Sequence, residues 1–152
     1  REACRTCGIK EKPALVFAFD VGAAGVKFTK KYVAQARREG WDSTAAQVRP
    51  DGDGSKLDWN DLWLRQQSWK GEERKGPLDE ESLEEYVWNG EITLAENAIR
   101  KARLIYERKT LASFHFRFDN RIYWARSKAD PDDGGTTLNV DEVANCAFRI
   151  LY

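Results

Sequence analysis

The N-terminal third of the chain holds the feature that most restricts its fold, an apolar strand followed by a helix and a second strand. Residues 13–20 read Pro-Ala-Leu-Val-Phe-Ala-Phe-Asp, an apolar run that ends in a charge. A run this apolar predicts a central strand buried on both sides, as in a parallel sheet. The small residues 21–25 form a turn, a helical pattern follows and stops at Gly40, and residues 43–49 predict the next strand. This order predicts a βαβ unit and an α/β fold.

A polar stretch at residues 70–78, which contains Gly and Pro, divides the predicted domain organisation. It is typical of a linker, here between an α/β core at residues 1–69 and an extension at residues 79–152. Near the end of the core, Asp58 or Asn60 is placed to cap a short helix. The length suits one ordinary domain with an appendage.

The extension is predicted to be a small α+β segment with two helices and an antiparallel hairpin. Helical spacing of apolar residues supports the helices, with an Asn-Gly stop between them. Alternating aromatics on both sides of Asp119-Asn120 support the hairpin. The pattern leaves open the type of the final element, residues 140–152. The helices are expected at residues 79–88 and 91–109, and the hairpin at residues 114–125.

Composition excludes two broad classes of protein. With 12% aromatic residues the chain is too aromatic for a disordered protein, and its apolar runs fall short of the roughly 18 residues that a membrane span needs. Three cysteines and no apolar secretory segment predict a cytoplasmic protein without a membrane partner. The zero net charge hides charge blocks: residues 51–91 carry 12 acidic and 5 basic side chains, whereas residues 1–50 carry 10 basic and 5 acidic.

Cysteine and histidine do not show the paired spacing of an ordinary zinc site. Cys4 and Cys7 have the spacing of half a zinc site, but four-coordinate zinc needs two more ligands, and Cys146 supplies no second pair. We therefore interpret them as unpaired thiols. His115 alternates with phenylalanines on the predicted hairpin and is interpreted as a residue of the sheet surface. Met is absent, although an open reading frame begins with it, so we expect the chain to be part of a longer protein.

Two acidic sets follow the two predicted strands and form the candidate site. Asp20 ends the first strand, and an Asp at the carboxyl end of a parallel strand points into the crevice where open α/β sheets bind ligands. Gly22 and Gly25 let a phosphate approach the backbone at the start of the next helix. The second set, Asp58 and Asp61, follows the second strand. Clustered carboxylates suit Mg²⁺, which shares its shell with phosphate oxygens, so phosphoryl transfer is the indicated reaction class.

These same residues resemble a known family. Residues 17–25, Phe-Ala-Phe-Asp-Val-Gly-Ala-Ala-Gly, resemble the strand-and-turn motif of Toprim domains, the catalytic cores of bacterial and phage primases and of type IA and II topoisomerases. Residues 56–62, Lys-Leu-Asp-Trp-Asn-Asp-Leu, resemble the acidic motif of primase-type Toprim proteins, with Leu57 as an extra residue. The resemblance covers residues 13–65 well and extends loosely to the rest, where the hairpin resembles phage- and plasmid-borne primases and primase–helicases.

The resemblance implies a Toprim-like parallel sheet with flanking helices and a role in DNA replication. It implies a DNA primase that makes primers on single-stranded DNA by nucleotidyl transfer, with Mg²⁺ or Mn²⁺ as cofactor. Single-stranded DNA and nucleotides are the implied partners, with a helicase domain or protein as a further candidate. Asp20 carries over as a metal ligand, with Asp58 and Asp61 as neighbours. The candidate nucleic-acid contacts are Lys27, Lys30, Lys31 and Lys56.

Two departures limit what carries over from the family. Gly22 stands where the family has the second Asp of its Asp-x-Asp motif, and Gly cannot bind a metal through a side chain. The family's general acid or base is a Glu that ends an earlier strand. We expect that strand upstream of Arg1, so the first strand of the core is missing and no catalytic residue is assigned within this chain. The chain alone is therefore expected to be inactive.

Other interpretations of the same residues stay open. A degenerate Toprim module could bind nucleic acid or a helicase without catalysis, which Gly22 favours, and a Toprim nuclease or topoisomerase fragment is a third reading. Asp20 and Asp58 could serve only as helix caps. The lysines could form a solvated helix face, and Trp59 and Trp63 could pack in a core rather than stack on bases.

Overall fold

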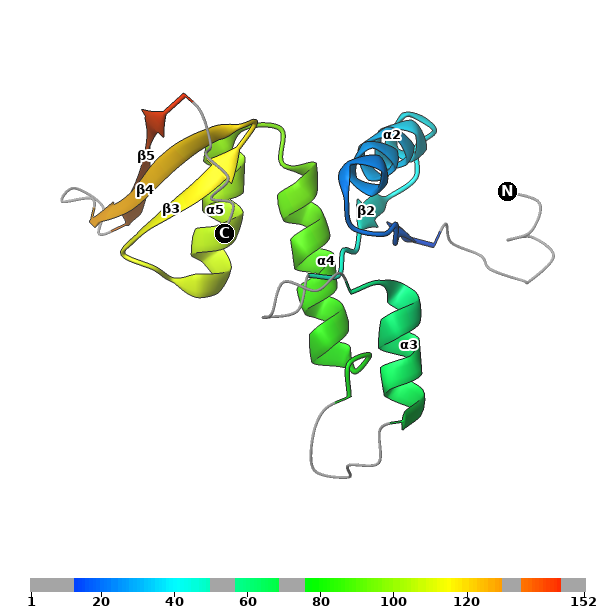
Figure 1. The fold of residues 1–152 in the computed structure, drawn as a ribbon. Helices are drawn as coiled ribbons and strands as arrows, with labels where there is room; N and C mark the ends of the chain where they lie inside the picture. The colour runs from blue at the N-terminus through cyan, green and yellow to red at the C-terminus, as the bar shows by residue number, and fades with distance from the viewer. Residues whose placement is uncertain (1–12, 50–56, 69–75, 130–134, 146–152) are drawn as a thin grey trace. The chain divides into compact units, whose positions relative to one another are not determined.

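The computed structural model describes residues 13–49, 57–68, 76–129 and 135–145. The chain divides into two compact units, residues 1–94 and residues 95–152, which are described separately below. The first contains a parallel two-stranded sheet and the second an antiparallel three-stranded sheet, so the fold is mixed α/β (Figure 1). Among the described residues, no helix combines the length and apolar character that a membrane crossing requires.

The predicted strand–helix–strand unit is present in the first unit. It consists of β1 (Leu15–Phe17), α2 (Ala23–Arg38) and β2 (Ser43–Ala45). The two strands are parallel, and the pairing runs from Leu15 opposite Ser43 to Phe17 opposite Ala45. The strands are shorter than predicted. The prediction that the first strand is buried on both sides is wrong, because Val16 of β1 is 51% exposed.

Helix α2 packs against the sheet through Thr29, Val33 and Ala36, whose spacing of four and three residues places them on one face. The helix ends as predicted at Gly40, which has a φ of 75°. The amide of Trp41 donates to the Ala36 carbonyl at 3.0 Å, and the amide of Gly40 donates to the Arg37 carbonyl at 3.0 Å. These two bonds form a Schellman motif, which satisfies carbonyls that the helix end leaves open.

An aromatic cluster connects α2 with β1 and with the loop that follows β1. Tyr32 of α2 stacks with Phe19 and Phe17, with ring centroids 5.6 and 6.5 Å apart, and Phe28 meets Phe19 in a tilted arrangement at 6.2 Å. Phe28 and Tyr32 follow the helical spacing of four residues that also leads to Ala36. Both remain partly exposed, whereas Ala36 is buried.

Helix α3 (Trp59–Ser68) and helix α4 (Glu80–Leu94) complete the first unit. A small core of Val48, Leu57 and Leu62 lies here. Trp59 is half-buried beside it and meets Tyr86 of α4 edge to face, with ring centroids 5.4 Å apart. The core-packing interpretation of Trp59 is therefore confirmed, whereas Trp63 is 55% exposed.

Helix α4 does not stop at Asn89-Gly90 as predicted, but continues to Leu94. The glycine serves a contact rather than a turn: a Cβ added at Gly90 would overlap the carbonyl oxygen of Ala45 on β2. The predicted helix at residues 91–109 is therefore also wrong. A new helix begins after Asn97, whose side chain accepts a hydrogen bond from the Arg100 amide at 2.8 Å and caps it.

The boundary between the units consequently differs from the predicted one. The sequence assigned residues 79–94 to the C-terminal extension, but α4 contacts α2 and β2. The division falls after Leu94. Because Gly90 brings the α4 backbone against β2, the helix belongs to the same compact unit as the parallel sheet.

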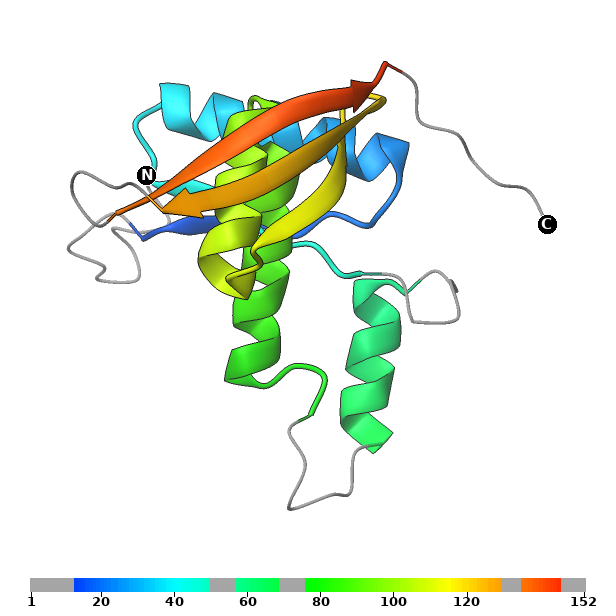
Figure 2. The same ribbon diagram turned by 90° about the vertical axis from the view of Figure 1, so that its left-hand side faces the viewer.

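The second unit is a helix packed on a three-stranded sheet. It consists of α5 (Ala98–Lys109), β3 (Ser113–Phe118), β4 (Arg121–Ala129) and β5 (Thr136–Ala144), and the strand order is β3-β4-β5 (Figure 2). The predicted hairpin is confirmed, and its turn residues Asp119 and Asn120 have φ values of 45° and 60°. Strand β5 resolves part of the C-terminal element that the pattern left open.

Candidate functional site

Asp20 lies in the loop between β1 and α2, and its carboxylate side chain is exposed. The loop is held close to the helix, since a Cβ on Gly25 would overlap the carbonyl oxygen of Asp20. The carbonyl of Gly22 accepts the first helical bond, from the Val26 amide at 2.9 Å. Backbone contacts thus fix the position of Asp20 at the carboxyl end of β1, where ligands bind in parallel α/β sheets.

The start of α2 has an electrostatic character that suits anions. Its N-cap is Gly22, which makes no side-chain cap, and its first turn contains no acidic residue. The partial positive charge of a helix N-terminus is therefore not offset by a carboxylate on the helix itself. Further along α2 the side chains of Lys27, Lys30 and Lys31 are exposed, which fits both the predicted DNA contacts and a solvated helix face.

Gly22 has a φ of 125°, which L side chains rarely adopt. The backbone at Gly22 therefore disfavours the second Asp of the family motif. An Asp at this position would be strained even though the space around it is open. The loop as folded presents one carboxylate, that of Asp20, rather than two.

Asp58 and Asp61 lie at the start of α3 and bind each other's backbone. The Asp61 amide donates to Asp58 Oδ1 at 2.8 Å, and the Asp58 amide donates to Asp61 Oδ2 at 3.0 Å. This reciprocal pair is a capping box in which Asp replaces the usual Glu. The helix-cap interpretation of Asp58 is confirmed. One oxygen of each carboxylate accepts a main-chain hydrogen bond in the cap. Lys56, the fourth predicted DNA contact, lies outside the described residues, as do Cys4, Cys7 and Cys146.

The described residues fit a weak divalent-cation site better than a protein cage. Within the described ranges, no three His, Cys, Asp or Glu side chains gather where they could hold a metal ion. Mg²⁺ does not require such a group, since it is commonly bound through one or two carboxylates together with waters and substrate phosphates. The exposed carboxylate of Asp20 suits the role of one such ligand.

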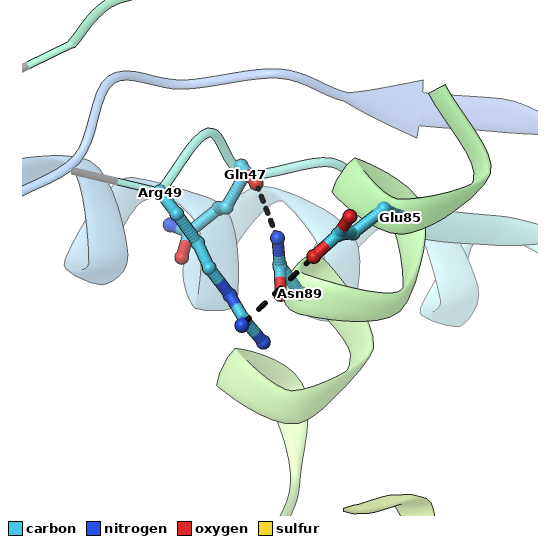
Figure 3. A network of polar contacts seen from close by, with 4 residues as sticks. All are labelled: Gln47, Arg49, Glu85 and Asn89. Atoms are coloured by element: carbon cyan, nitrogen blue, oxygen red, sulfur yellow. Dashed lines mark hydrogen bonds and ion pairs between the residues drawn. The ribbon is translucent and has the colours of Figure 1, made fainter. Parts of the chain in front are cut away.

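A buried polar network at the end of β2 was not predicted. Gln47 is only 6% exposed, and its main-chain amide donates to the main-chain carbonyl of Tyr86 on α4 at 2.8 Å. The Asn89 side chain donates to the Gln47 main-chain carbonyl at 3.3 Å (Figure 3). The Thr93 hydroxyl donates to Gln47 Oε1 at 2.6 Å. The network attaches the segment after β2 to α4. The sequence signal that could have revealed it is a Gln within an otherwise apolar run, Ala45 to Val48.

The same segment places a cation that sequence reasoning also missed. Arg49 lies beyond the carboxyl end of β2, with its guanidinium 3.9 Å from a Glu85 oxygen (Figure 3). The guanidinium also lies 4.9 Å from the ring centroid of Trp88. Its side chain is about half exposed. The contacts with Trp88 and Glu85 place the Arg49 guanidinium beside α4.

Comparison of the chain with family models, curated proteins and solved structures gave no match.

Proposed function

We propose that this chain is the Toprim-like part of a DNA primase of a phage or other mobile element, and that its first unit binds nucleotide phosphates together with Mg²⁺ or Mn²⁺. One observation carries the proposal. The carboxylate of Asp20 is exposed in the loop that follows a parallel strand and leads to a 16-residue helix with no side-chain cap and no acidic first turn.

The residues of the first unit would divide the work between them. Asp20 would hold the cation, the first-turn amides of α2 would receive phosphate oxygens, and Lys27 and Lys31 would attract the DNA backbone. When bound, a divalent cation supplies positive charge that offsets the phosphate charge during nucleotidyl transfer. A single-stranded DNA template, nucleotides and a helicase partner belong to this proposal.

The test is metal-dependent nucleotide binding by the chain, measured by calorimetry with a deoxynucleoside triphosphate and Mn²⁺ or Mg²⁺. Asp20→Ala should weaken binding by at least about tenfold, or about 1.4 kcal/mol. Asp42→Ala is the matched control, because Asp42 is also exposed but lies at the amino end of β2, whereas Asp20 follows the carboxyl end of β1. Binding by Asp42→Ala should be unchanged. Equal binding by the two variants would contradict the role of Asp20. Primer synthesis by the protein that contains this chain should be lost in Asp20→Ala.

A second candidate, a non-catalytic nucleic-acid-binding module, is favoured by the loop and by the capping box. Gly22 offers no ligand and has a backbone unsuited to Asp, and Asp58 and Asp61 each spend an oxygen on α3. This candidate predicts salt-sensitive DNA binding that survives both Asp20→Ala and removal of metal by a chelator. Primer synthesis that depends on Asp20 would exclude it.

A further inference from the structure

In the second unit, α5 packs on one face of the three-stranded sheet, and no other helix of this unit lies among its described residues to cover the opposite face. The covered face carries the buried core of the unit, Ala102, Phe116 and Ala125. Successive side chains on a strand point to opposite faces of the sheet, so the residues next to Phe116 and Ala125 along β3 and β4 lie on the face opposite to α5. The opposite face carries a stacked aromatic pair and three basic side chains, namely His115, Trp124, Arg117, Arg126 and Lys128.

The aromatic pair on this opposite face is already stacked. His115 on β3 is directly opposite Trp124 on β4, and the two rings are 5.7 Å apart with an interplanar angle of 9°. The guanidinium of Arg126 lies over the Trp124 ring, 4.3 Å from its centroid. These three planar groups form a row: His115 lies opposite Trp124 on the adjacent strand, and Arg126 lies two residues beyond Trp124 on β4. His115 and Arg126 are exposed, and Trp124 is half-buried.

The charge around this row is mainly positive. Arg117 and Lys128 are exposed on the same face, at either end of the hairpin. Among the described residues that share this face, Asp141 on β5 is the acidic one, and it pairs with Arg126. Arg117 donates to the Asn120 side chain at 2.8 Å, which fixes its guanidinium near the turn.

A row of planar groups beside cations has the chemistry of a base-stacking surface. Every nucleobase offers a flat π face to an aromatic ring or a guanidinium, and basic side chains attract the phosphates between the bases. A single strand can use such a surface because its bases are open, whereas the bases of a duplex are stacked on each other. The row adds little to the core, because the apolar residues that pack under α5 lie on the other face.

We propose that this face, defined by His115, Trp124, Arg126, Arg117 and Lys128, binds single-stranded DNA by stacking bases on the His115–Trp124 pair. The site is separate from the loop at Asp20 and requires no metal. It goes beyond the proposed function, because a template-binding surface in the second unit would work whether or not the first unit binds nucleotides.

The test is binding of a fluorescein-labelled oligothymidylate of about 16 nucleotides to the full chain, followed by fluorescence anisotropy in the presence of EDTA. Trp124→Leu should weaken binding by about fivefold or more, since it removes a stacking ring. The double variant Arg117→Glu with Lys128→Glu should weaken binding further and flatten its dependence on salt. Arg103→Glu is the charge control, because Arg103 is exposed on α5, away from the residues that pack on the sheet.

The outcomes separate this proposal from the one for the first unit. Equal binding by the wild-type chain, Trp124→Leu and the double variant would overturn it, as would an equal loss in Arg103→Glu. A loss confined to Asp20→Ala would place DNA binding in the first unit and would also overturn it. Because Trp124→Leu could disturb the sheet, His115→Ala provides a second variant at an exposed position, and circular dichroism of each variant should match that of the wild type.

Discussion

Gly90 occupies a point at which two backbones of the first unit come close together. It lies within α4, where glycine is normally a poor choice, yet its missing side chain leaves the helix in contact with the Ala45 carbonyl of β2. Gly90 therefore lowers the helix propensity of α4 at this position but allows the tertiary contact with β2. In an exposed helix, Gly→Ala stabilises by about 1 kcal/mol.

Gly90→Ala should have the opposite sign here and destabilise the chain by about 2 kcal/mol, because the added methyl group has backbone rather than a flexible side chain in its way. Urea unfolding, followed by circular dichroism, measures the change. The neighbouring variant Glu91→Ala, at an exposed position of the same helix, should change stability by less than about 0.5 kcal/mol. An increase in stability for Gly90→Ala would refute the close contact.

At the same scale, sequence reasoning located Asp20 and the glycine turn but not the residues around them. Asp20 was identifiable because a charge at the end of an apolar run is a local signal. The positive φ of Gly22 and the burial of Gln47 depend on contacts with α2 and α4. Such contacts leave no periodic pattern in the sequence.

Among the elements, α3 shows most clearly how one residue can be read in two ways. Asp58 was predicted either to bind a metal or to cap the helix, and it caps the helix. Its carboxylate can still offer the oxygen that the cap does not use. Substitutions that keep the cap but remove the charge separate these two roles.

Asp58→Asn should change the free energy of unfolding by less than about 0.5 kcal/mol, because Asn caps helices as well as Asp does, whereas Asp58→Ala should cost about 1 kcal/mol. Thermal unfolding of both variants checks this. Calorimetry then tests the metal role: Mn²⁺-dependent nucleotide binding that falls in Asp58→Asn despite normal stability would show that the carboxylate also serves the cation. A stability loss of equal size in both variants would contradict the capping geometry.

The elements that sequence reasoning found were those whose ends carry local signals. Gly40 closes α2 through a Schellman motif, and Asp119-Asn120 form the hairpin turn with positive φ values. The Asn89-Gly90 pair carries the same kind of signal, but α4 continues through it because the glycine is needed against β2. Local turn chemistry is therefore decisive only where no tertiary contact requires the same residue.

At the scale of the whole molecule, the chain consists of two units with separate cores. Val33 and Ala36 are buried in the first unit, and Ala102, Phe116 and Ala125 are buried in the second. The sequence placed this division at residues 70–78, since Gly and Pro are typical of linkers, but the division falls after Leu94.

Separate cores imply that each unit can lose its structure without the other. Ala102→Asp places a carboxylate at a fully buried position of the second unit. Hydrogen exchange followed by mass spectrometry should then show lost protection at residues 98–129 and retained protection at residues 23–48. Ala36→Asp should give the reverse pattern. Simultaneous loss of protection in both units in either variant would show that they unfold as one.

The network around Gln47 has a consequence for how this sequence can change over time. The backbone of Gln47 bonds to Tyr86 and Asn89, and its side chain bonds to the Thr93 hydroxyl. Replacing Thr93 alone would remove the hydroxyl that donates to the buried Gln47 Oε1, whereas Asn89 donates to the main-chain carbonyl that any residue at position 47 supplies. In descendants of this chain, positions 47 and 93 should therefore change together, whereas position 89 is not tied to the side chain at position 47.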